Sequence, residues 1–378
     1  MTICVCTESR DVYSETFIRD HIDRLPGQTF ALTGGWPVWE YGDRKVIPDR
    51  YRLGMTFGGK IHSSLPAFSR RRAEQSLAAF FRERGVDAVL AEYGEVAVTL
   101  IESCRTARIP LIAHFHGYDA YHHRVLAEQK EGYQRLFRSA AAVIAVSRDM
   151  ERQLLELGAP RAKVSYNSYG VDLQRFTATD PSLNPPHFLA VGRFVDKKAP
   201  HLTLLAFVDV VKAEPTARLI FAGDGYLLDA CQQMARALGL DEKVQFLGRQ
   251  SHEQISMLMH GARAFVQHSV TATYGDSEGT PVGVLEACAC ALPVVATRHC
   301  GIADVVQDRE SGWLVGERDV RGMAEGMIEL ARKPDLARTW GLRAREYVAV
   351  HHAIDSQIRG LASILEGAAR RAHPERNW

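Results

Sequence analysis

The sequence has little of what marks several large protein classes. It contains no apolar run of about 18 residues, so we expect no segment that spans a membrane. The first residues lack a basic start followed by an apolar core, so no secretory signal is predicted. Seven cysteines, an odd number in a chain of 378 residues, argue against a disulfide framework and for a reducing compartment. These absences together predict a cytoplasmic protein.

Charge is nearly balanced, since 46 Lys and Arg stand against 45 Asp and Glu and the net charge is +1. So small a charge gives no general field that would attract nucleic acid, and no nucleic-acid partner is expected. The stretch 44–84 departs from this balance, with ten basic residues against three acidic ones. Two interpretations stay open: a solvated face, or a surface that meets an anionic membrane or a phosphate-bearing acceptor. The second would place the protein peripherally on the inner face of the cytoplasmic membrane.

A helix-like segment over 69–85 bears on that choice. Helical spacing places Leu77, Phe80 and Phe81 on one side and the arginines mainly elsewhere. Such a helix could lie at an anionic interface. Alternatively, it is a surface helix that buries its apolar side in its own domain.

Short apolar runs recur along the chain and alternate with helix-like stretches. Runs without polar alternation are typical of parallel strands covered on both faces, and repeated strand–helix units predict doubly wound sheets. We therefore predict an α/β fold. The expected strands are 3–6, 88–91, 111–115, 142–146, 187–192, 217–223, 244–248, 263–268 and 293–297. The expected helices between them include 71–84, 147–157, 201–212 and 251–260.

The length predicts two domains, because single hydrophobic cores stop growing near about 250–300 residues. The segment 171–186 contains three prolines and no periodicity, which is typical of a linker. We place the N-terminal domain at 1–175 and the C-terminal domain at 176–352. After Trp313 the strand pattern stops, and residues 319–331, 335–350 and 353–371 are expected to be helices.

The segment 274–297 carries the strongest chemical signal. Thr280 can cap a helix and Pro281 suits its first position, so the helix start offers free N–H groups and a positive dipole end to an anion. Gly283 removes a side chain where a ligand would approach. Glu278 lies before the cap and Glu286 roughly 7 Å along the axis. The two carboxylates could grip one ligand, or be a loop glutamate and an ordinary helix glutamate.

The segment 192–201, GRFVDKKAPH, places a basic turn after a predicted strand. Ligands of open α/β sheets bind at the C-terminal ends of the strands, so Arg193 and Lys198 would project toward an anion. Arg holds phosphate oxygens in a fork, whereas Lys acts as a point charge. Lys197 is equally basic, so charge alone does not select Lys198. Exposed, solvated cations are the alternative.

The segment 114–119, HFHGYD, follows another predicted strand. Strand alternation points His114 and His116 to one side, and Gly117 permits a sharp turn. Two histidines at this spacing could bind zinc, but no third ligand is obvious nearby, so no metal is predicted. A histidine and an aspartate at a strand end, His116 and Asp119, suit hydrogen bonding to a polar substrate.

The segment 222–227, AGDGYL, gives a further strand, glycine-rich turn and helix, which is a weak signal by itself. The chain has neither a G-x-G-x-x-G turn nor a P-loop, which lowers the case for dinucleotide enzymes and P-loop NTPases. It also has no G-x-S-x-G elbow and no H-E-x-x-H helix, so hydrolases of those types lose support.

Several of these segments together resemble a known family. The spacing from Glu278 to Glu286 is the E-x7-E spacing of the retaining glycosyltransferases of family 4. The other matching segments are GRFVDKKAP, AGDGYLLDACQQMARALGL, VQFLGRQSHEQISMLM and SGWLVGERDV, so that the resemblance covers nearly the whole chain. In the N-terminal half the similarity is to the subgroup that builds bacterial exopolysaccharides, colanic-acid enzymes included; it lies in SETFIRDHI, HFHGYD and AVSRDM.

The resemblance implies a GT-B fold, in which two Rossmann-like domains face each other across a cleft. The C-terminal domain would bind a nucleotide-diphosphate sugar, a UDP- or GDP-sugar, and the N-terminal domain a glycan or lipid-linked saccharide acceptor. The last helix, 353–378, would pack back on the first domain. The implied enzyme is a metal-independent hexosyltransferase without a cofactor, active in exopolysaccharide or lipopolysaccharide biosynthesis.

Roles follow from the resemblance residue by residue. Glu286 would hold the ribose hydroxyls, and Leu247–Arg249 would line the base pocket. The implied catalytic residues are His116 beside the reacting sugar, Arg193 and Lys198 at the diphosphate, and Glu278 at the donor sugar. The implied donor contacts are Gly192, Arg193, Lys198, Gly223, Gly225, Gly248, Arg249, Glu278, Gly279, Thr280, Pro281, Val282, Gly283 and Glu286. The implied acceptor contacts are Ser14, Glu15, Thr16, His116, Gly117 and Asp119.

One departure and two alternatives accompany this interpretation. Many relatives carry a Gly-Gly loop after the first strand, where this chain has CTESRDVYSET with Ser14, Glu15 and Thr16. A sugar-nucleotide epimerase on the same fold would instead turn over a nucleotide sugar without an acceptor. A catalytically inactive partner subunit would only bind, and it would have less need of charges at the breaking bond.

Overall fold

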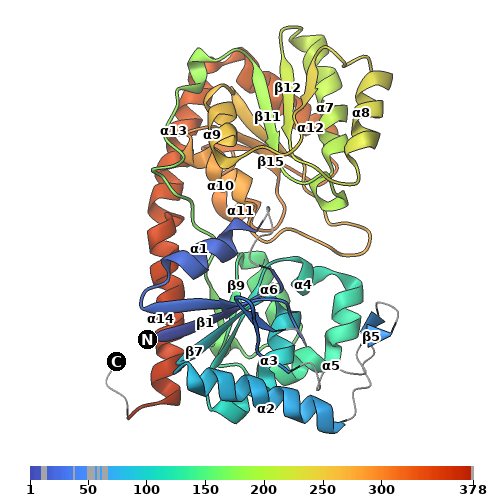
Figure 1. The fold of residues 1–378 in the computed structure, drawn as a ribbon. Helices are drawn as coiled ribbons and strands as arrows, with labels where there is room; N and C mark the ends of the chain where they lie inside the picture. The colour runs from blue at the N-terminus through green and yellow to red at the C-terminus, as the bar shows by residue number, and fades with distance from the viewer. Residues whose placement is uncertain (10–14, 37–38, 49–55, 58–59, 62–66, 376–378) are drawn as a thin grey trace. The chain divides into compact units, whose positions relative to one another are not determined.

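The computed structural model describes residues 1–9, 15–36, 39–48, 56–57, 60–61 and 67–375 (Figure 1). The chain divides into two compact units. Unit 1 comprises Met1–Val146, Met150–Asn167 and Ile358–Trp378, and unit 2 comprises Ser147–Asp149 and Ser168–Gln357. The chain therefore passes between units near residue 167, and its last helix groups with unit 1 from Ile358 onward. Among the described residues, no helix is long and apolar enough to cross a bilayer.

Unit 1 is built on a six-stranded parallel sheet with the order β10-β9-β8-β7-β1-β2. Its strands are β1 (Thr2–Cys6), β2 (Gln28–Leu32), β7 (Ala88–Glu92), β8 (Leu111–Phe115), β9 (Ala142–Ala145) and β10 (Val164–Tyr166). The helices are α1 (Thr16–Arg24), α2 (Ala67–Glu83), α3 (Gly94–Ala107), α4 (Tyr118–Tyr121), α5 (His123–Ser139), α6 (Arg148–Glu156), the 3-10 turn Arg161–Lys163 and α14 (Ile354–Ala372). Two short ribbons join β3 (Glu40–Tyr41) to β4 (Arg44–Lys45) and β5 (Thr56–Phe57) to β6 (Lys60–Ile61).

Unit 2 is built on a second parallel sheet, with the order β13-β12-β11-β14-β15-β16. Its strands are β11 (His187–Val191), β12 (Arg218–Ala222), β13 (Val244–Phe246), β14 (Ala264–Gln267), β15 (Val294–Thr297) and β16 (Gly312–Val315). The helices are α7 (Pro200–Ala213), α8 (Leu228–Ala237), α9 (His252–His260), α10 (Val282–Ala289), α11 (Ile302–Val305), α12 (Val320–Arg332) and α13 (Pro334–His351), with 3-10 turns at Pro181–Leu183 and Asp196–Lys198. Figure 1 shows α7, α8 and α12 on one side of this sheet and α9 and α10 on the other.

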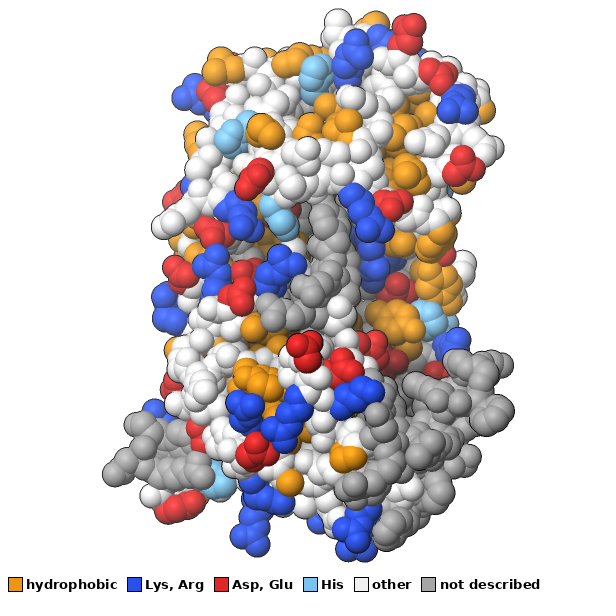
Figure 2. Space-filling view, viewed as in Figure 1, with side chains coloured by type: hydrophobic (Ala, Val, Ile, Leu, Met, Phe, Trp, Pro, Cys, Tyr) orange, Lys and Arg blue, Asp and Glu red, His pale blue; other side chains and the backbone are white. Residues whose placement is uncertain are grey.

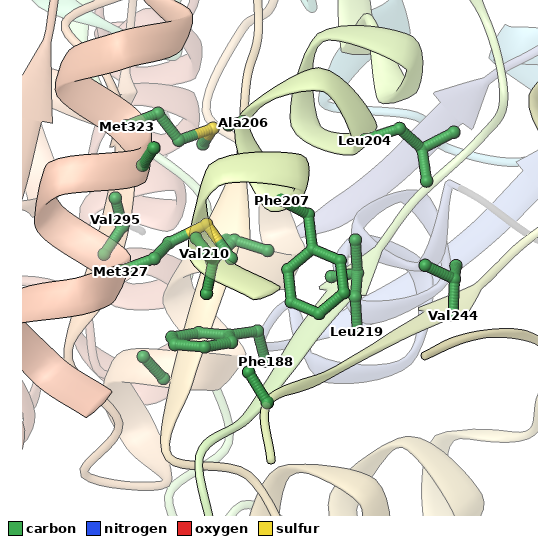
Figure 3. Close-up of a cluster of buried hydrophobic side chains, with 14 of the residues drawn as sticks. Phe188, Leu204, Ala206, Phe207, Val210, Leu219, Val244, Val295, Met323 and Met327 are labelled. Carbon is green, nitrogen blue, oxygen red and sulfur yellow. The ribbon is translucent and has the colours of Figure 1, made fainter. Parts of the chain in front are cut away.

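The core of unit 2 lies between this sheet and the helices α7 and α12. Phe207 and Val210 of α7 lie against Phe188 of β11, and Met323 and Met327 of α12 close the cluster beside them (Figure 3). All five side chains are fully buried. Burial of this kind stabilises by roughly 1.5–3 kcal/mol for each large apolar side chain. The site-bearing loops therefore start from well-packed strands.

The predicted α/β fold is confirmed, and each of the nine expected strands overlaps a strand of one sheet. Within the described residues, the two six-stranded sheets contain three further strands, β2, β10 and β16, and all three lie at a sheet edge. An edge strand has one neighbour and is covered less completely, so its sequence carries a weaker apolar signal. The expectation that strands end at Trp313 was wrong, because β16 runs from Gly312 to Val315 and pairs with β15.

Helix α2 buries the apolar side that the sequence placed together. Leu77, Phe80 and Phe81 are at most 2% exposed, so they pack within unit 1 and do not form an outer apolar face. Arg70, Arg71 and Arg72 are exposed on the same helix. Figure 2 shows Lys and Arg interspersed with Asp and Glu over the visible face. Arg50 and Arg52 of the basic stretch lie outside the described residues.

Candidate active site

In unit 2, the turns that follow β11 and β12 are joined through their backbones. The Gly192 N–H donates to Ala222 O at 3.0 Å, and the Phe194 N–H donates to Asp224 O at 2.9 Å. Gly223 has a φ of +150°, and a Cβ placed on it would lie 1.9 Å from Gly192 O. Only glycine permits so close an approach of two backbones. This junction fixes the turn that carries Arg193.

Three charged side chains on the turn after β11 have different surroundings. The Lys198 ammonium lies 3.0 Å from Glu278 Oε1. Lys197 is turned to a separate buried pair, 2.9 Å from Asp276 Oδ1. Arg193 is exposed, and no ion pair involves it within the described part of the chain. The structure thus separates the two lysines that charge alone could not distinguish.

Glu278 is a buried carboxylate held from several sides. Its side chain is 8% exposed and accepts a hydrogen bond from Ser269 Oγ at 3.1 Å. Burial raises the pKa of Glu278, but the ammonium groups of Lys198 and Lys197 outweigh burial and lower that pKa to about 2. Burial also lowers the pKa of Lys198. Glu278 therefore stays ionised and acts as a fixed hydrogen-bond acceptor.

A histidine behind Glu278 fixes its backbone. The Glu278 N–H donates to His299 Nε2 at 3.3 Å, and His299 Nδ1 lies 2.6 Å from Glu317 Oε1. Because Nε2 accepts, Nδ1 must carry the proton and donate to Glu317. Glu317 also accepts from the backbone and the hydroxyl of Thr271. Hydrogen bonding by His299, aided by Thr271, lowers the pKa of Glu317 to about 2.

Helix α10 presents its N-terminus to the same edge of the sheet. It begins at Val282 with Pro281 as the N-cap residue. The expected cap at Thr280 was wrong, because Pro281 has an extended ψ of 116° and the helix starts one residue later. A Cβ on Gly283 would lie 3.4 Å from Val191 O and 3.3 Å from the Phe265 ring. The helix start therefore packs directly on the end of β11.

Glu286 lies in the second turn of α10 and is 6% exposed. Its Oε1 lies 3.5 Å from His252 Nδ1, at the start of α9. The sequence required a partner for this charge among apolar neighbours, and His252 supplies one. The carboxylate thus stands within unit 2 as a second, separately held acceptor.

A pocket lies at the C-terminal ends of β11, β12 and β14. It holds about 310 Å³ of space outside the protein atoms and opens to solvent. Its polar lining residues are Gly192, Arg193, Lys198, Thr203, Gln267 and His268. The oxygen Gln267 Oε1 has no hydrogen-bond partner among the described residues. A ligand here would meet two cations.

Gly248 and Arg249, which were expected near the nucleotide base, follow β13 and contact the turn after β12. Gly248 has a φ of +66°, and its carbonyl accepts from the Gly223 N–H at 2.8 Å. The Arg249 guanidinium lies 3.0 Å from Asp224 Oδ2 and is mostly exposed. Gly225 has a φ of +153°, and a Cβ there would lie 2.5 Å from Phe194 O. The Gly279 carbonyl accepts a hydrogen bond from the Gly301 N–H at 3.0 Å.

In unit 1, Asp119 anchors the turn after β8. It is fully buried, and its carboxylate accepts from the N–H groups of Gly94 at 2.8 Å, His116 at 2.9 Å and Gly117 at 3.1 Å. Burial raises the pKa of Asp119 against these hydrogen bonds. Gly117 supplies the sharp turn with a φ of +129°. Asp119 therefore shapes this region from within.

His116 lies among aromatic and acidic side chains of unit 1. Its ring centroid is 4.7 Å from those of both Phe17 and Tyr93. A hydrogen bond involving Glu15 contributes, after burial, to a raised pKa of Tyr93. Glu15 and Thr16 stand at the start of α1, so the structure brings Glu15 and His116 together through Tyr93. Ser14 lies outside the described residues.

Sequence reasoning missed three functional candidates in unit 1, which are Glu92, His21 and Glu95. Glu92 lies 2.7 Å from both His21 Nδ1 and His116 Nε2, and 3.3 Å from His114 Nδ1. Ligand atoms of His21, Glu92 and His114 all lie within 4.8 Å of one another, so within the described part of the chain these three residues form a group that could hold a metal ion. Glu95, at the start of α3, has a pKa raised to about 7 by burial and by the nearby carboxylates of Asp119 and Glu8.

The signals for Glu92 and His21 were weak in the sequence. Glu92 follows the expected strand 88–91 directly, which places it at the edge where ligands bind. His21 lies 71 residues from Glu92 in the chain. No local sequence pattern links Glu92 with His21. The two residues are brought together by the pairing of β7 with β8 and by the position of α1.

Comparison with known proteins agrees with this geometry. Residues 38–175 match the family model described as Glycosyltransferase Family 4, and residues 175–347 match the model described as Glycosyl transferases group 1. A protein of Salmonella typhimurium named as a colanic acid biosynthesis glycosyltransferase, WcaL, is 30% identical over 286 residues, covering 74% of this chain and 70% of its own. The amylovoran biosynthesis glycosyltransferase AmsK of Erwinia amylovora is 31% identical over 258 residues, covering 68% and 63%.

A solved structure shares the fold at low identity. HepE of Anabaena, crystallised in complex with UDP, superposes with a TM-score of 0.76 at 17% identity, covering 97% of this chain and 100% of its own. This likeness and the two parallel sheets confirm the expected GT-B fold. Together with the family models and the relatives above, they show that the chain belongs to the family 4 glycosyltransferases and is similar to the colanic acid and amylovoran enzymes.

Proposed function

We propose that this chain transfers a sugar, with retention, from a nucleotide-diphosphate sugar to a hydroxyl of a glycan or lipid-linked saccharide. Unit 2 would bind the donor, a UDP- or GDP-sugar, and unit 1 the acceptor. The observation that carries the proposal is the convergence of Arg193, Lys198 and the start of α10 at one sheet edge. HepE, which has the same fold, was solved with UDP and with UDP-glucose. The relatives named for colanic acid and amylovoran biosynthesis support a role in exopolysaccharide or lipopolysaccharide assembly.

The proposed reaction needs charge stabilisation more than a nucleophile. The bond between the sugar C1 and the diphosphate oxygen breaks, and the electron pair leaves with the diphosphate. The acceptor oxygen bonds to C1, and its proton passes to the leaving diphosphate. Two cations and a helix N-terminus stabilise the developing charge in place of a metal. Glu278 and Glu286, each fixed within unit 2, would accept hydrogen bonds from hydroxyls of the sugar and the ribose.

Thermal unfolding with nucleotides tests this function directly. We expect one of UDP, GDP, ADP and dTDP to stabilise the protein by about 2.7 kcal/mol when present at about 100 times its dissociation constant. The shift should be the same with magnesium and with EDTA, because Arg193 and Lys198 supply the positive charge. If none of the four stabilises the protein under either condition, the proposal is wrong. Conversion of a sugar nucleotide without an acceptor would instead identify an epimerase.

We also propose that the exposed arginines of α2 bring the chain to an anionic membrane surface. Because Leu77 and Phe80 are buried, attraction would be electrostatic and fall with salt, at about 1 kcal/mol for each basic residue near the surface. Co-sedimentation with phosphatidylglycerol vesicles should therefore decrease strongly in the variant with Arg70, Arg71 and Arg72 all replaced by Glu. The single change Arg124→Glu, at an exposed arginine of α5, is the control. Absence of binding by the wild type at low salt would refute the membrane proposal.

A further inference from the structure

Three side chains from three elements of unit 1 meet beneath the surface at the C-terminal edge of the sheet. Glu92 ends β7, and its register partner on the neighbouring strand β8 is His114. His21 comes from α1. Glu92 and His114 are fully buried, and His21 is 5% exposed. The sequence showed no third ligand beside His114 and His116, but the fold brings a carboxylate and a distant imidazole to His114.

These three side chains turn their ligand atoms toward one another. One ligand atom of each residue lies within 4.8 Å of the other two. His21 Nδ1 lies 2.7 Å from Glu92 Oε1, and His114 Nδ1 lies 3.3 Å from Glu92 Oε2. A tetrahedral zinc ion with bonds of about 2.0–2.1 Å holds its ligand atoms about 3.3 Å apart. The observed distances are close to this value, so small side-chain movements would admit the ion.

His114 supplies the observation that points to a ligand. Its side chain is 1% exposed, and neither of its ring nitrogens has a hydrogen-bond partner among the described residues. A buried polar group without a partner costs free energy, and a bound ion or an ordered water commonly accounts for one. Because His114 Nδ1 lies next to the Glu92 carboxylate, a cation held by that carboxylate would also satisfy the imidazole.

The donor atoms indicate which metal would bind. Two imidazole nitrogens and a carboxylate oxygen suit zinc, whereas magnesium and calcium prefer oxygen ligands alone. Non-haem iron enzymes use the same donors but keep open positions for their substrates. The three ligands here are at least 95% buried, which favours a closed site. A water would complete the four ligands of the zinc ion.

We propose that His21, Glu92 and His114 bind one zinc ion, which fixes α1 to the C-terminal ends of β7 and β8. Helix α1 has nine residues, and its N-cap residue Glu15 makes no side-chain capping bond. So short a helix is marginal without tertiary contacts. Ligation of His21 adds a strong contact from its buried side to the sheet. The ion therefore has a structural role in unit 1 and takes no part in the reaction proposed above.

His116 contacts one of the proposed ligands from outside the group. Its Nε2 lies 2.7 Å from Glu92 Oε2. A side chain that hydrogen-bonds to a metal-bound carboxylate orients that ligand, and its loss typically weakens metal affinity about 10- to 100-fold. His116→Ala should therefore weaken zinc binding by this factor without abolishing it, whereas loss of His21 or His114 should abolish it.

Elemental analysis tests the site on full-length protein that is purified without a histidine tag or a chelator. We expect about one zinc per chain, which is lost in His21→Ala and in His114→Ala. His299→Ala is the matched control, because it removes another buried imidazole, 2.6 Å from Glu317 Oε1, and should keep the zinc. Wild-type protein without stoichiometric zinc, even after incubation with a zinc salt, would overturn the proposal. So would zinc that persists in both variants.

Hydrogen exchange of the wild type tests the structural role without any substitution. Removal of zinc with a chelator should speed amide exchange in α1 and leave exchange in α9 of unit 2 unchanged. Added zinc should restore the protection of α1, and added magnesium should not. Unchanged exchange in α1 after complete removal of zinc would refute the structural role.

These measurements need neither donor nor acceptor, so they fail separately from the proposed function. A protein that holds zinc but transfers no sugar with any donor refutes the proposed function alone. A protein that transfers sugar but binds no zinc refutes the metal site alone. The stabilisation by nucleotide should be the same with and without zinc, because Arg193 and Lys198 belong to unit 2.

Discussion

Replacing Lys198 with methionine should lower kcat about 10²- to 10³-fold, which is the usual cost of removing one preorganised charge from a developing anion. Methionine keeps the length and apolar stem of the side chain and removes only the ammonium. Lys198 Nζ lies 3.0 Å from Glu278 Oε1 and lines the pocket at the ends of β11 and β12. The rate is measured with saturating donor and acceptor, and nucleotide affinity by thermal shift.

Loss of Lys198 should also affect stability, and the pH dependence identifies the cause. The folded pKa of Glu278 is about 2, below its ordinary value of 4.5. A lowered carboxyl pKa contributes stability that is present above about pH 4.5 and lost as the pH falls toward 2. This contribution is about 3 kcal/mol at neutral pH. The free energy of unfolding of Lys198→Met should therefore approach that of the wild type between pH 4.5 and 2.

Two comparison variants separate catalysis from stability. Arg193→Met removes an exposed cation, so it should slow transfer by a similar factor without changing the unfolding temperature. Lys197→Met breaks a buried ion pair with Asp276 that lies 2.9 Å apart, so it should destabilise the protein while slowing transfer much less. Equal rate losses in Lys197→Met and Lys198→Met would contradict the assignment of Lys198 to the diphosphate.

Much of the fold could be predicted because apolar runs specify the covered strands. The nine predicted strands are those with continuous apolar sequence, and they include every central strand of both sheets. The strands β2, β10 and β16 were missed at the edges, where one side of each strand lacks a neighbour. The helices at 319–331, 335–350 and 353–371 were predicted within a few residues of α12, α13 and α14.

The sequence predicted which residues lie near the candidate site, but it did not predict which of them pair. Sequence position placed Lys197 and Lys198 at the same turn. Only the folded structure shows that Lys197 pairs with Asp276 and Lys198 with Glu278. The same holds for unit 1, where His116 was found by its place after a strand. Its partner Glu92 depends on the register of β7 with β8, which no local pattern reveals.

Gly223→Ala should be among the most destabilising single changes in the chain. The added Cβ would lie 1.9 Å from Gly192 O and 2.8 Å from Gly192 C. Neither of these backbone atoms can move without breaking the hydrogen bond that the Gly192 N–H donates to Ala222 O. The positive φ of +150° adds strain of its own. We expect a loss of about 4 kcal/mol or more in the free energy of unfolding.

The control for this change is another glycine with a positive φ but open space. Gly239 has a φ of +68° and nothing within 4 Å of its would-be Cβ. Gly239→Ala therefore carries the conformational cost alone, about 1 kcal/mol. Urea unfolding of the two variants isolates the contact between the turns after β11 and β12. Because that contact positions Arg193, any folded Gly223→Ala protein should also lose the stabilisation by nucleotide, whereas Gly239→Ala should keep it. Equal stability of the two variants would show that the junction of the turns is not rigid.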